Sequence, residues 1–122
     1  MRTLQLIFFF TLFLLSSEAQ TLSPFSLKNV LDGNQISLAD VNSSQGLVII
    51  FTSVACPFDG YYTNRLVQLQ NTYKDKLPIL LVNSYTEAPE AEEWMIKTAS
   101  ANGLTLPYLS DKEQMLFTQL GV

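Results

Sequence analysis

The chain has 122 residues, of which 48% are hydrophobic and 15% charged, a globular composition of a length that suits one small domain. Its formal charge is −4, from 7 Lys and Arg against 11 Asp and Glu, and the basic residues form no cluster, which argues against nucleic acid as a partner. The sequence has no histidine, which excludes Ser-His-Asp and Cys-His catalysis within the chain and argues against a dedicated zinc or copper site. The sequence therefore predicts no metal ion and no cofactor.

The first 19 residues have the pattern of a secretory signal peptide. Arg2 gives a short positive region, positions 4–15 are almost entirely apolar, and Ser17 and Ala19 are the small residues that a signal peptidase reads. The apolar stretch is shorter than the ~20 residues that a membrane span needs. We therefore expect cleavage after Ala19, export to a periplasmic or secreted location, and no stable membrane anchor after cleavage. An uncleaved signal anchor is the alternative interpretation.

Strands are predicted in the first part of the mature chain. Residues 23–41 have the pattern of two short strands around the turn residues Asp32 and Gly33. The run GLVIIFTS, residues 46–53, is β-branched and aromatic, which is typical of a strand buried on both faces, and LPILLVNS, residues 77–84, is a second such run. Two strands of this kind with a helical segment between them predict a βαβ unit with parallel strands.

The segment between these two strands is predicted to be an amphipathic helix. Pro57 suits its first position, where a missing N–H costs nothing. Apolar residues recur along it at spacings of four, three and four, which predicts one inward-facing stripe of Tyr62, Leu66, Leu69 and Tyr73.

A second helix is predicted to begin at Pro89 and to end at Gly103 as its C-terminal cap. The acidic residues between Glu87 and Glu93 indicate a solvated helix start, where negative charge suits the helix dipole, and they do not form a metal site. The residues predicted to face inward are Trp94, Met95, Thr98 and Ala99.

A third helix is predicted just before the end of the sequence. Ser110 and Glu113 have the spacing of a capping box, and Gly121 is a stop signal. Only two convincing central strands precede Val122, which is too little sheet for a finished α/β domain. We therefore expect residues 20–122 to be one domain whose C-terminal part is missing.

The single cysteine, Cys56, lies between the first long strand and the helix that follows it. Unpaired N–H groups and the helix dipole at a helix N-terminus favour a thiolate, which is the nucleophilic form of cysteine. Ligands of open α/β sheets also bind beyond the carboxyl ends of the strands. Both points favour a reactive thiol, and a buried structural cysteine is the other interpretation. Asp59, in the first helical turn, opposes a nearby thiolate, and Arg65 offsets that charge if its side chain reaches back.

The stretch FTSVACPF resembles the thioredoxin-like superfamily, in which a strand that ends in an aromatic residue leads to a cysteine at a helix start. CPFDGYYTNRLVQLQNTY resembles more narrowly its redoxin branch, the AhpC/TSA-type proteins. Members of that branch often have Tyr six and Arg nine residues after the cysteine, and Tyr62 and Arg65 match those spacings. ILLVNS and LTLPYLSDKEQMLFTQLGV resemble later segments of the same family, so that the resemblance covers roughly residues 25–122.

This resemblance implies an α/β, thioredoxin-like fold with a βαβ core and helices on both faces. It also implies an oxidoreductase: a thiol–disulfide oxidoreductase, or an antioxidant protein that reduces peroxides, in which Cys56 attacks the disulfide or the peroxide. Ser53 would then hydrogen-bond the sulfur, Pro57 would shape the helix start, and Arg65 would support the site. The implied partners are an external thiol or disulfide protein, or a small peroxide.

The chain departs from the family's patterns at two positions. Asp59 stands where a C-x-x-C motif has its second cysteine, so an external thiol, or a cysteine beyond Val122, would have to resolve Cys56. Ile49 stands where a typical peroxiredoxin motif has proline. A thioredoxin-like binding module without turnover is therefore the alternative function. Separately, Asn42 begins an N-glycosylation sequon, which has meaning only in a eukaryotic secretory pathway.

Overall fold

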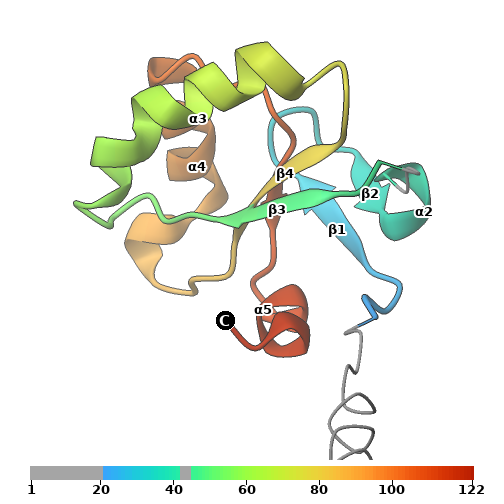
Figure 1. Ribbon diagram of the computed structural model, residues 1–122. Helices are drawn as coiled ribbons and strands as arrows, with labels where there is room; N and C mark the ends of the chain where they lie inside the picture. The colour runs from blue at the N-terminus through green and yellow to red at the C-terminus, as the bar shows by residue number, and fades with distance from the viewer. Residues whose placement is uncertain (1–20, 42–44) are drawn as a thin grey trace, which may run out of the picture.

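The computed structural model describes residues 21–41 and 45–122. The predicted signal peptide and the sequon at Asn42 lie outside the described residues. The described part forms a mixed five-stranded sheet with helices packed on it (Figure 1). No helix in this part is long and apolar enough to cross a membrane.

The sheet has the strand order β2-β1-β5-β4-β3. Its strands are β1 (Ser26–Asn29), β2 (Gln35–Ser37), β3 (Val48–Phe51), β4 (Ile79–Asn83) and β5 (Tyr108–Ser110). The strands β3, β4 and β5 run parallel to one another, whereas β1 is antiparallel to both β2 and β5. The predicted βαβ unit is thus confirmed, and β5 adds a third parallel strand on the other side of β4.

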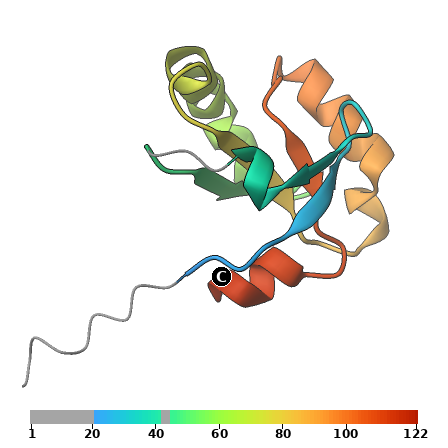
Figure 2. The same ribbon diagram turned by 90° about the vertical axis from the view of Figure 1, so that its right-hand side faces the viewer.

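Helices cover both faces of the sheet (Figure 2). They are α2 (Leu38–Val41), α3 (Asp59–Tyr73), the 3₁₀ helix η2 (Ala88–Glu90), α4 (Glu92–Ala101) and α5 (Met115–Leu120). The helices α3 and α4 lie on one face, and α5 lies on the other. This is the α/β, thioredoxin-like arrangement that the resemblance implies.

The core consists of two apolar clusters, one on each face of the sheet. Alternate residues of β4 point to opposite faces, and Leu81 joins the cluster under α4 while Leu80 joins the cluster under α5. All five residues of β4 are buried. The first cluster contains Val30, Ile79, Leu81, Met95, Ala99, Leu106 and Tyr108. The second contains Phe25, Leu27, Leu80, Val82, Leu109 and Leu116.

The hairpin between β1 and β2 turns at the predicted residues. Gly33 has a φ of 77°, a conformation that favours glycine, and its N–H donates to the Asn29 carbonyl at 2.8 Å. The Asp32 carboxylate accepts from the Asn34 N–H at 2.9 Å, which fixes the turn from its own side chain.

The position of β3 corrects one prediction. The apolar run at residues 46–53 indicates a strand buried on both faces, but β3 is half-buried and lies at the edge of the five-stranded sheet that the structure describes. The N–H groups of Val48 and of Thr52, the residue after β3, donate to the carbonyls of Pro78 and Val82. Because alternate residues of a strand face opposite neighbours, the N–H groups of Ile49 and Phe51 face the open edge.

The predicted stripe of α3 is only half right. Leu66 and Leu69 are partly buried, but Tyr62 is 53% exposed and Tyr73 is 42% exposed. The buried residue of this helix is Gln70. Its side-chain N–H donates to the Gly103 carbonyl at 3.2 Å, and its oxygen accepts from the N–H groups of Thr105 and Leu106 at 2.7 and 3.2 Å.

The inward face of α4 is confirmed at Met95 and Ala99, which are buried, whereas Trp94 is 42% exposed. Gly103 follows this helix with a φ of 67°, as expected for a C-terminal cap. The helix begins at Glu92 rather than at Pro89, because the 3₁₀ turn of η2 comes first. Glu90 ends that turn and is buried, so the prediction that this acidic stretch is a solvated helix start is wrong at this residue.

The predicted capping box of the last helix is also wrong, because α5 begins only at Met115. Asp111, which is fully buried, accepts hydrogen bonds from the N–H groups of Met115, Leu116 and Phe117 at 2.8, 3.1 and 3.1 Å. The predicted stop is confirmed, since Gly121 has a φ of 66° and its N–H donates to the Phe117 carbonyl.

Candidate functional site

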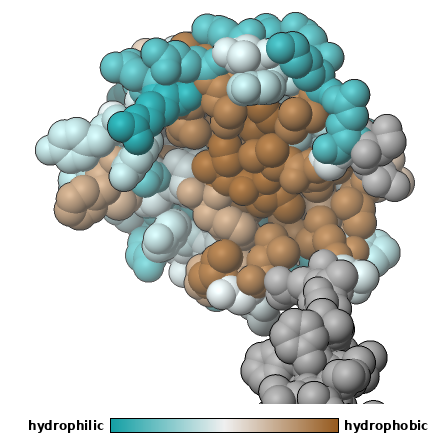
Figure 3. Space-filling view, in the orientation of Figure 1, coloured by the Kyte–Doolittle hydropathy of each residue, from teal (hydrophilic) through white to brown (hydrophobic). Residues whose placement is uncertain are grey.

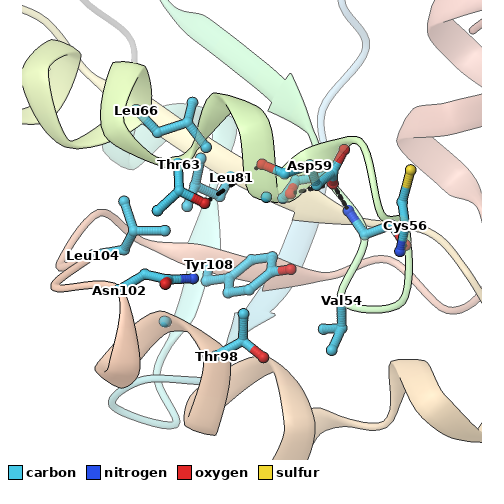
Figure 4. Close-up of a pocket in the computed structure, with 14 residues that line it drawn as sticks. Val54, Cys56, Asp59, Thr63, Leu66, Leu81, Thr98, Asn102, Leu104 and Tyr108 are labelled. Atoms are coloured by element: carbon cyan, nitrogen blue, oxygen red, sulfur yellow. Dashed lines mark hydrogen bonds between the residues drawn. The ribbon is translucent and has the colours of Figure 1, made fainter.

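Cys56 lies in the loop that joins the carboxyl end of β3 to the start of α3 (Figure 4). Its residue is partly exposed, and its sulfur points away from Tyr108 and the interior. The Cys56 N–H donates to the Ser53 hydroxyl oxygen at 3.1 Å, and its carbonyl accepts from the Asp59 N–H at 3.2 Å. The sequence therefore placed the thiol correctly at a strand–helix junction, three residues before the helix begins.

Ser53 acts on the backbone of Cys56 rather than on its sulfur. The Ser53 hydroxyl accepts from the Cys56 N–H and donates its hydrogen to a carboxylate oxygen of Glu90. A hydroxyl has one hydrogen to donate, so the expected bond from Ser53 to the sulfur is replaced by the bond to Glu90.

The Glu90 carboxylate accepts four hydrogen bonds although it is only 3% exposed. Oε1 accepts from the Ser53 hydroxyl and from the Ala55 N–H at 2.9 Å. Oε2 accepts from the Val54 N–H and from the Asn83 side chain, both at 2.7 Å. Burial, the largest single influence, raises the pKa of Glu90, but these hydrogen bonds together outweigh it and hold the pKa below its ordinary value of 4.5. Glu90 is therefore charged at neutral pH.

Asp59 lies in the first turn of α3, as predicted, where it is the first helical residue, and its carboxylate faces back to the end of β3. Its Oδ2 accepts from the Thr52 hydroxyl at 2.8 Å and from the Ser53 N–H. The carboxylate whose charge was expected to oppose a thiolate thus accepts hydrogen bonds from two donors that follow β3. The loop is consequently fixed at both of its sides, by Asp59 and by Glu90.

The other two predicted site residues, Pro57 and Arg65, are both exposed. Pro57 is exposed and precedes the first helical residue by two positions, so it lies in the turn that leads into α3 and not in the helix. Arg65 is exposed, and its guanidinium carbon lies 5.6 Å from the ring centroid of Tyr62. The structure therefore joins Arg65 to an aromatic ring instead of to Asp59.

A cavity of about 150 Å³ lies beside the loop, between α3 and α4. Its polar lining includes Thr52, Asp59, Thr63 and Asn102, together with the buried residue Tyr108. Burial, the largest influence, raises the pKa of the Tyr108 phenol, which therefore stays protonated at neutral pH. Among residues 21–41 and 45–122, no three His, Cys, Asp or Glu side chains form a group that would hold a metal ion.

Sequence reasoning missed Glu90, Asn83 and Lys112 as parts of this site. The Lys112 ammonium donates to the Asn83 side-chain oxygen and to the carbonyls of Tyr85 and Glu90, at 3.1, 2.6 and 2.8 Å. One signal was present: Asn83 lies at the carboxyl end of β4, next to the end of β3, where polar side chains of parallel strands converge. Nothing in the local sequence distinguishes Glu90 from its exposed acidic neighbours.

Comparison with known proteins agrees with this geometry. A sequence model of the AhpC/TSA family matches residues 19–122. Among curated proteins, none matches the chain.

Solved structures with the same fold include two that are more than 25% identical to this chain over the aligned residues. An uncharacterized conserved protein from Geobacillus kaustophilus has a TM-score of 0.78 and 33% identity over 86% of this chain and 60% of its own. A hypothetical protein from Sinorhizobium meliloti 1021 has a TM-score of 0.74 and 27% identity over 81% of this chain and 56% of its own. The chain thus spans less than two thirds of the length of either protein.

A third structure, of a secreted disulfide oxidoreductase from Mycobacterium tuberculosis, has a TM-score of 0.66 over 79% of this chain and 66% of its own. At 16% identity it shows the shared fold alone. The family match covers all of the described residues, and the neighbours share the fold. The chain is therefore a thioredoxin-like redoxin protein that belongs to the AhpC/TSA family.

Proposed function

We propose that this protein is an exported thiol-dependent oxidoreductase in which Cys56 is the reacting residue. The observation that carries the proposal is the position of Cys56: a partly exposed thiol beyond the carboxyl end of β3, in a loop held by hydrogen bonds and directly before α3. Membership of the AhpC/TSA family supports redox chemistry at such a thiol. Export rests on the signal-peptide pattern of residues 1–19.

With a disulfide as substrate, the Cys56 thiolate attacks one sulfur of the disulfide bond. A bond forms between Cys56 and that sulfur, the original S–S bond breaks, and the other sulfur leaves as a thiolate that takes up a proton. The chain has no second cysteine. An external thiolate must therefore attack the mixed disulfide, which oxidises that thiol and returns Cys56 to its reduced form.

With a peroxide as substrate, the Cys56 thiolate attacks one oxygen of the O–O bond. Cys56 is oxidised to a sulfenic acid, and the other oxygen leaves with a proton as water or an alcohol. An external thiol then condenses with the sulfenic acid and releases water, which gives a mixed disulfide with that thiol, and a second external thiol reduces it and returns Cys56 to its reduced form. Both routes need a thiol from another molecule or from a longer form of the chain.

A single-turnover experiment tests the proposal. The reduced protein is mixed separately with oxidised glutathione and with hydrogen peroxide, and the adducts are followed by mass spectrometry. We expect a mixed disulfide with the first reagent and a sulfenic acid with the second, each faster than with a peptide of residues 52–60. Cys56→Ser removes both adducts and leaves the fold unchanged by circular dichroism. Rates that equal those of the unfolded peptide would show that the fold does not activate the thiol.

The alternative is a thioredoxin-like module that binds a partner without turnover. Asp59 favours it, because this carboxylate occupies the place of a resolving cysteine and is committed to hydrogen bonds with Thr52 and Ser53. If Cys56→Ser retains full function in cells that need the protein, binding is its role. Loss of that function together with loss of the adducts would exclude the alternative.

A further inference from the structure

Glu90 connects two segments that lie far apart in the sequence. Three of its four donors are on the loop before Cys56, at separations of 37, 36 and 35 residues: the Ser53 hydroxyl, the Val54 N–H and the Ala55 N–H. Because these three donors are consecutive, one carboxylate accepts from all of them only when the loop has one particular backbone conformation. The Glu90 carboxylate thus fixes the backbone conformation of residues 53–55.

Glu90 is itself held in place from behind. The Asn83 side chain, which is fully buried, donates to Oε2 at 2.7 Å. Lys112 donates to the Glu90 carbonyl at 2.8 Å and to the Tyr85 carbonyl at 2.6 Å, which fixes both ends of the segment that carries Glu90. The carboxylate is therefore positioned by Asn83 at the buried end of β4, and the segment that carries it is held by Lys112, two residues beyond β5.

The contact between Glu90 and the loop reaches Cys56 through Ser53. The Cys56 N–H donates to the Ser53 hydroxyl, and the same hydroxyl donates to Glu90. Moving the carboxylate would therefore move the hydroxyl, and with it the only side chain that receives the Cys56 N–H in the described structure.

We propose that Glu90 is a positioning residue for the thiol chemistry: its buried carboxylate fixes the conformation of residues 53–55 and thereby the place from which Cys56 reacts. The effect on the reaction of Cys56 rests on the proposed function. The conformation of residues 53–55 does not depend on it and is measured separately. Among the described residues, Lys112 and Tyr108 are the titratable groups that interact electrostatically with Glu90.

The variant Glu90→Gln tests the proposal with little change in side-chain size. A carboxamide has one acceptor oxygen and an NH₂ group that only donates, so it serves either the Ser53 and Ala55 donors or the Val54 and Asn83 donors. Glu87→Gln is the matched control: it removes an acidic residue from the same segment, but Glu87 is exposed and contacts the loop through no hydrogen bond of its side chain that the described structure contains.

Two readouts separate positioning from electrostatics. The first is hydrogen exchange at the Val54 and Ala55 amides, which we expect Glu90→Gln to speed up by roughly 10-fold or more at one or both positions. The second is the rate of mixed-disulfide formation with oxidised glutathione across a range of pH. At alkaline pH, where the thiol is fully ionised, we expect the limiting rate to fall by roughly 10- to 100-fold. Glu87→Gln should change neither.

Removal of the negative charge alone would give a different result. It would move the pH at which the rate rises, because a nearby carboxylate disfavours the thiolate, and it would leave the limiting rate unchanged. An unchanged limiting rate, or unchanged amide exchange at both Val54 and Ala55, therefore overturns the proposal. If the wild-type protein does not react with oxidised glutathione or peroxide, the proposed function fails, and amide exchange alone decides whether Glu90 fixes the loop.

Ser53→Ala covers the case in which Glu90→Gln does not fold. This change removes only the link between Glu90 and Cys56 and leaves the bonds to Val54 and Ala55 in place. We expect faster exchange at the Cys56 amide, retained protection at Val54 and Ala55, and a limiting rate between those of the wild type and Glu90→Gln. Unchanged exchange at Cys56 would contradict the proposed path through Ser53.

Discussion

Gln70 is the buried polar residue of α3, and its side chain holds the connection between α4 and β5. It is 4% exposed, and its amide both donates to Gly103 and accepts from the N–H groups of Thr105 and Leu106. These backbone groups belong to the connection between α4 and β5. The amide therefore satisfies them where no strand or helix does, and it fixes that connection against α3.

We expect Gln70→Leu to lower the free energy of unfolding by roughly 1–3 kcal/mol or more, because it leaves the Thr105 and Leu106 N–H groups without an acceptor. The measurement is urea denaturation followed by circular dichroism. Gln68→Leu on the exposed side of the same helix is the control and should change the unfolding free energy by less than about 0.5 kcal/mol. Equal effects of the two variants would contradict the role assigned to Gln70.

The pH dependence of stability should report on Glu90. Its pKa in the folded protein lies below the ordinary value of 4.5, because its hydrogen bonds together outweigh the effect of burial. A group of this kind stabilises the fold above its unfolded pKa, and this contribution is lost as pH falls through the folded pKa. We expect the difference in unfolding free energy between wild type and Glu90→Gln to shrink between about pH 7 and about pH 3. A difference that stays constant over this range would contradict the assignment.

At the scale of elements, the N-terminus of α5 is capped by Asp111 and not by the predicted pair of Ser110 and Glu113. Asp111 accepts from three N–H groups at the start of the helix and from the Ser84 hydroxyl at 2.8 Å, whereas Glu113 is exposed. We expect Asp111→Ala to lower the unfolding free energy by about 2 kcal/mol or more and Glu113→Ala to have little effect. Thermal denaturation of the two variants checks this. A larger loss of stability in Glu113→Ala than in Asp111→Ala would support the predicted capping box instead.

Elements with a strong local signal were predictable from the sequence, and elements defined by distant partners were not. The hairpin at Asp32 and Gly33, the two long strands and the cysteine junction all depend on neighbouring residues. By contrast, β5 has only three residues and becomes a strand because β4 and β1 pair with it. The edge position of β3 likewise depends on the sheet order, which hydrophobicity does not encode.

The same distinction applies to the candidate site. Cys56, Ser53 and Asp59 lie within seven residues of one another, and sequence reasoning found all three. It assigned the Ser53 hydroxyl to the wrong acceptor because the true one, Glu90, is 37 residues away. An acidic residue next to a helix start looks solvated in sequence, and only the fold shows that three loop donors surround it.

At the scale of the whole molecule, one face of the described protein is apolar. Figure 3 shows a continuous hydrophobic area over the β3 side of the sheet, between α3 and α5. Phe117 packs its ring edge-on against Phe51 of β3 and is 39% exposed, and it lines a small hollow together with Thr52, Tyr85 and Val122, which is 57% exposed. An apolar face next to an open strand edge favours self-association.

We expect the chain as given to self-associate with rising concentration, and Phe117→Lys to reduce this by placing a charge on the apolar face. Sedimentation velocity over a concentration series measures the effect. Thr118→Lys adds the same charge at the neighbouring exposed position and is the control for net charge alone. If both variants reduce association equally, the apolar face is not its cause.

Mixed disulfides of the single cysteine, Cys56, can identify the molecules that react with it. Residues 1–122 contain one cysteine and cannot form a disulfide among themselves, so every disulfide found in a purified sample of this chain joins it to another molecule. Each such adduct preserves the identity of the molecule that Cys56 met. When the protein is isolated from cells with acid quenching and alkylation, its mixed disulfides at Cys56 are therefore preserved, and each identifies one thiol partner.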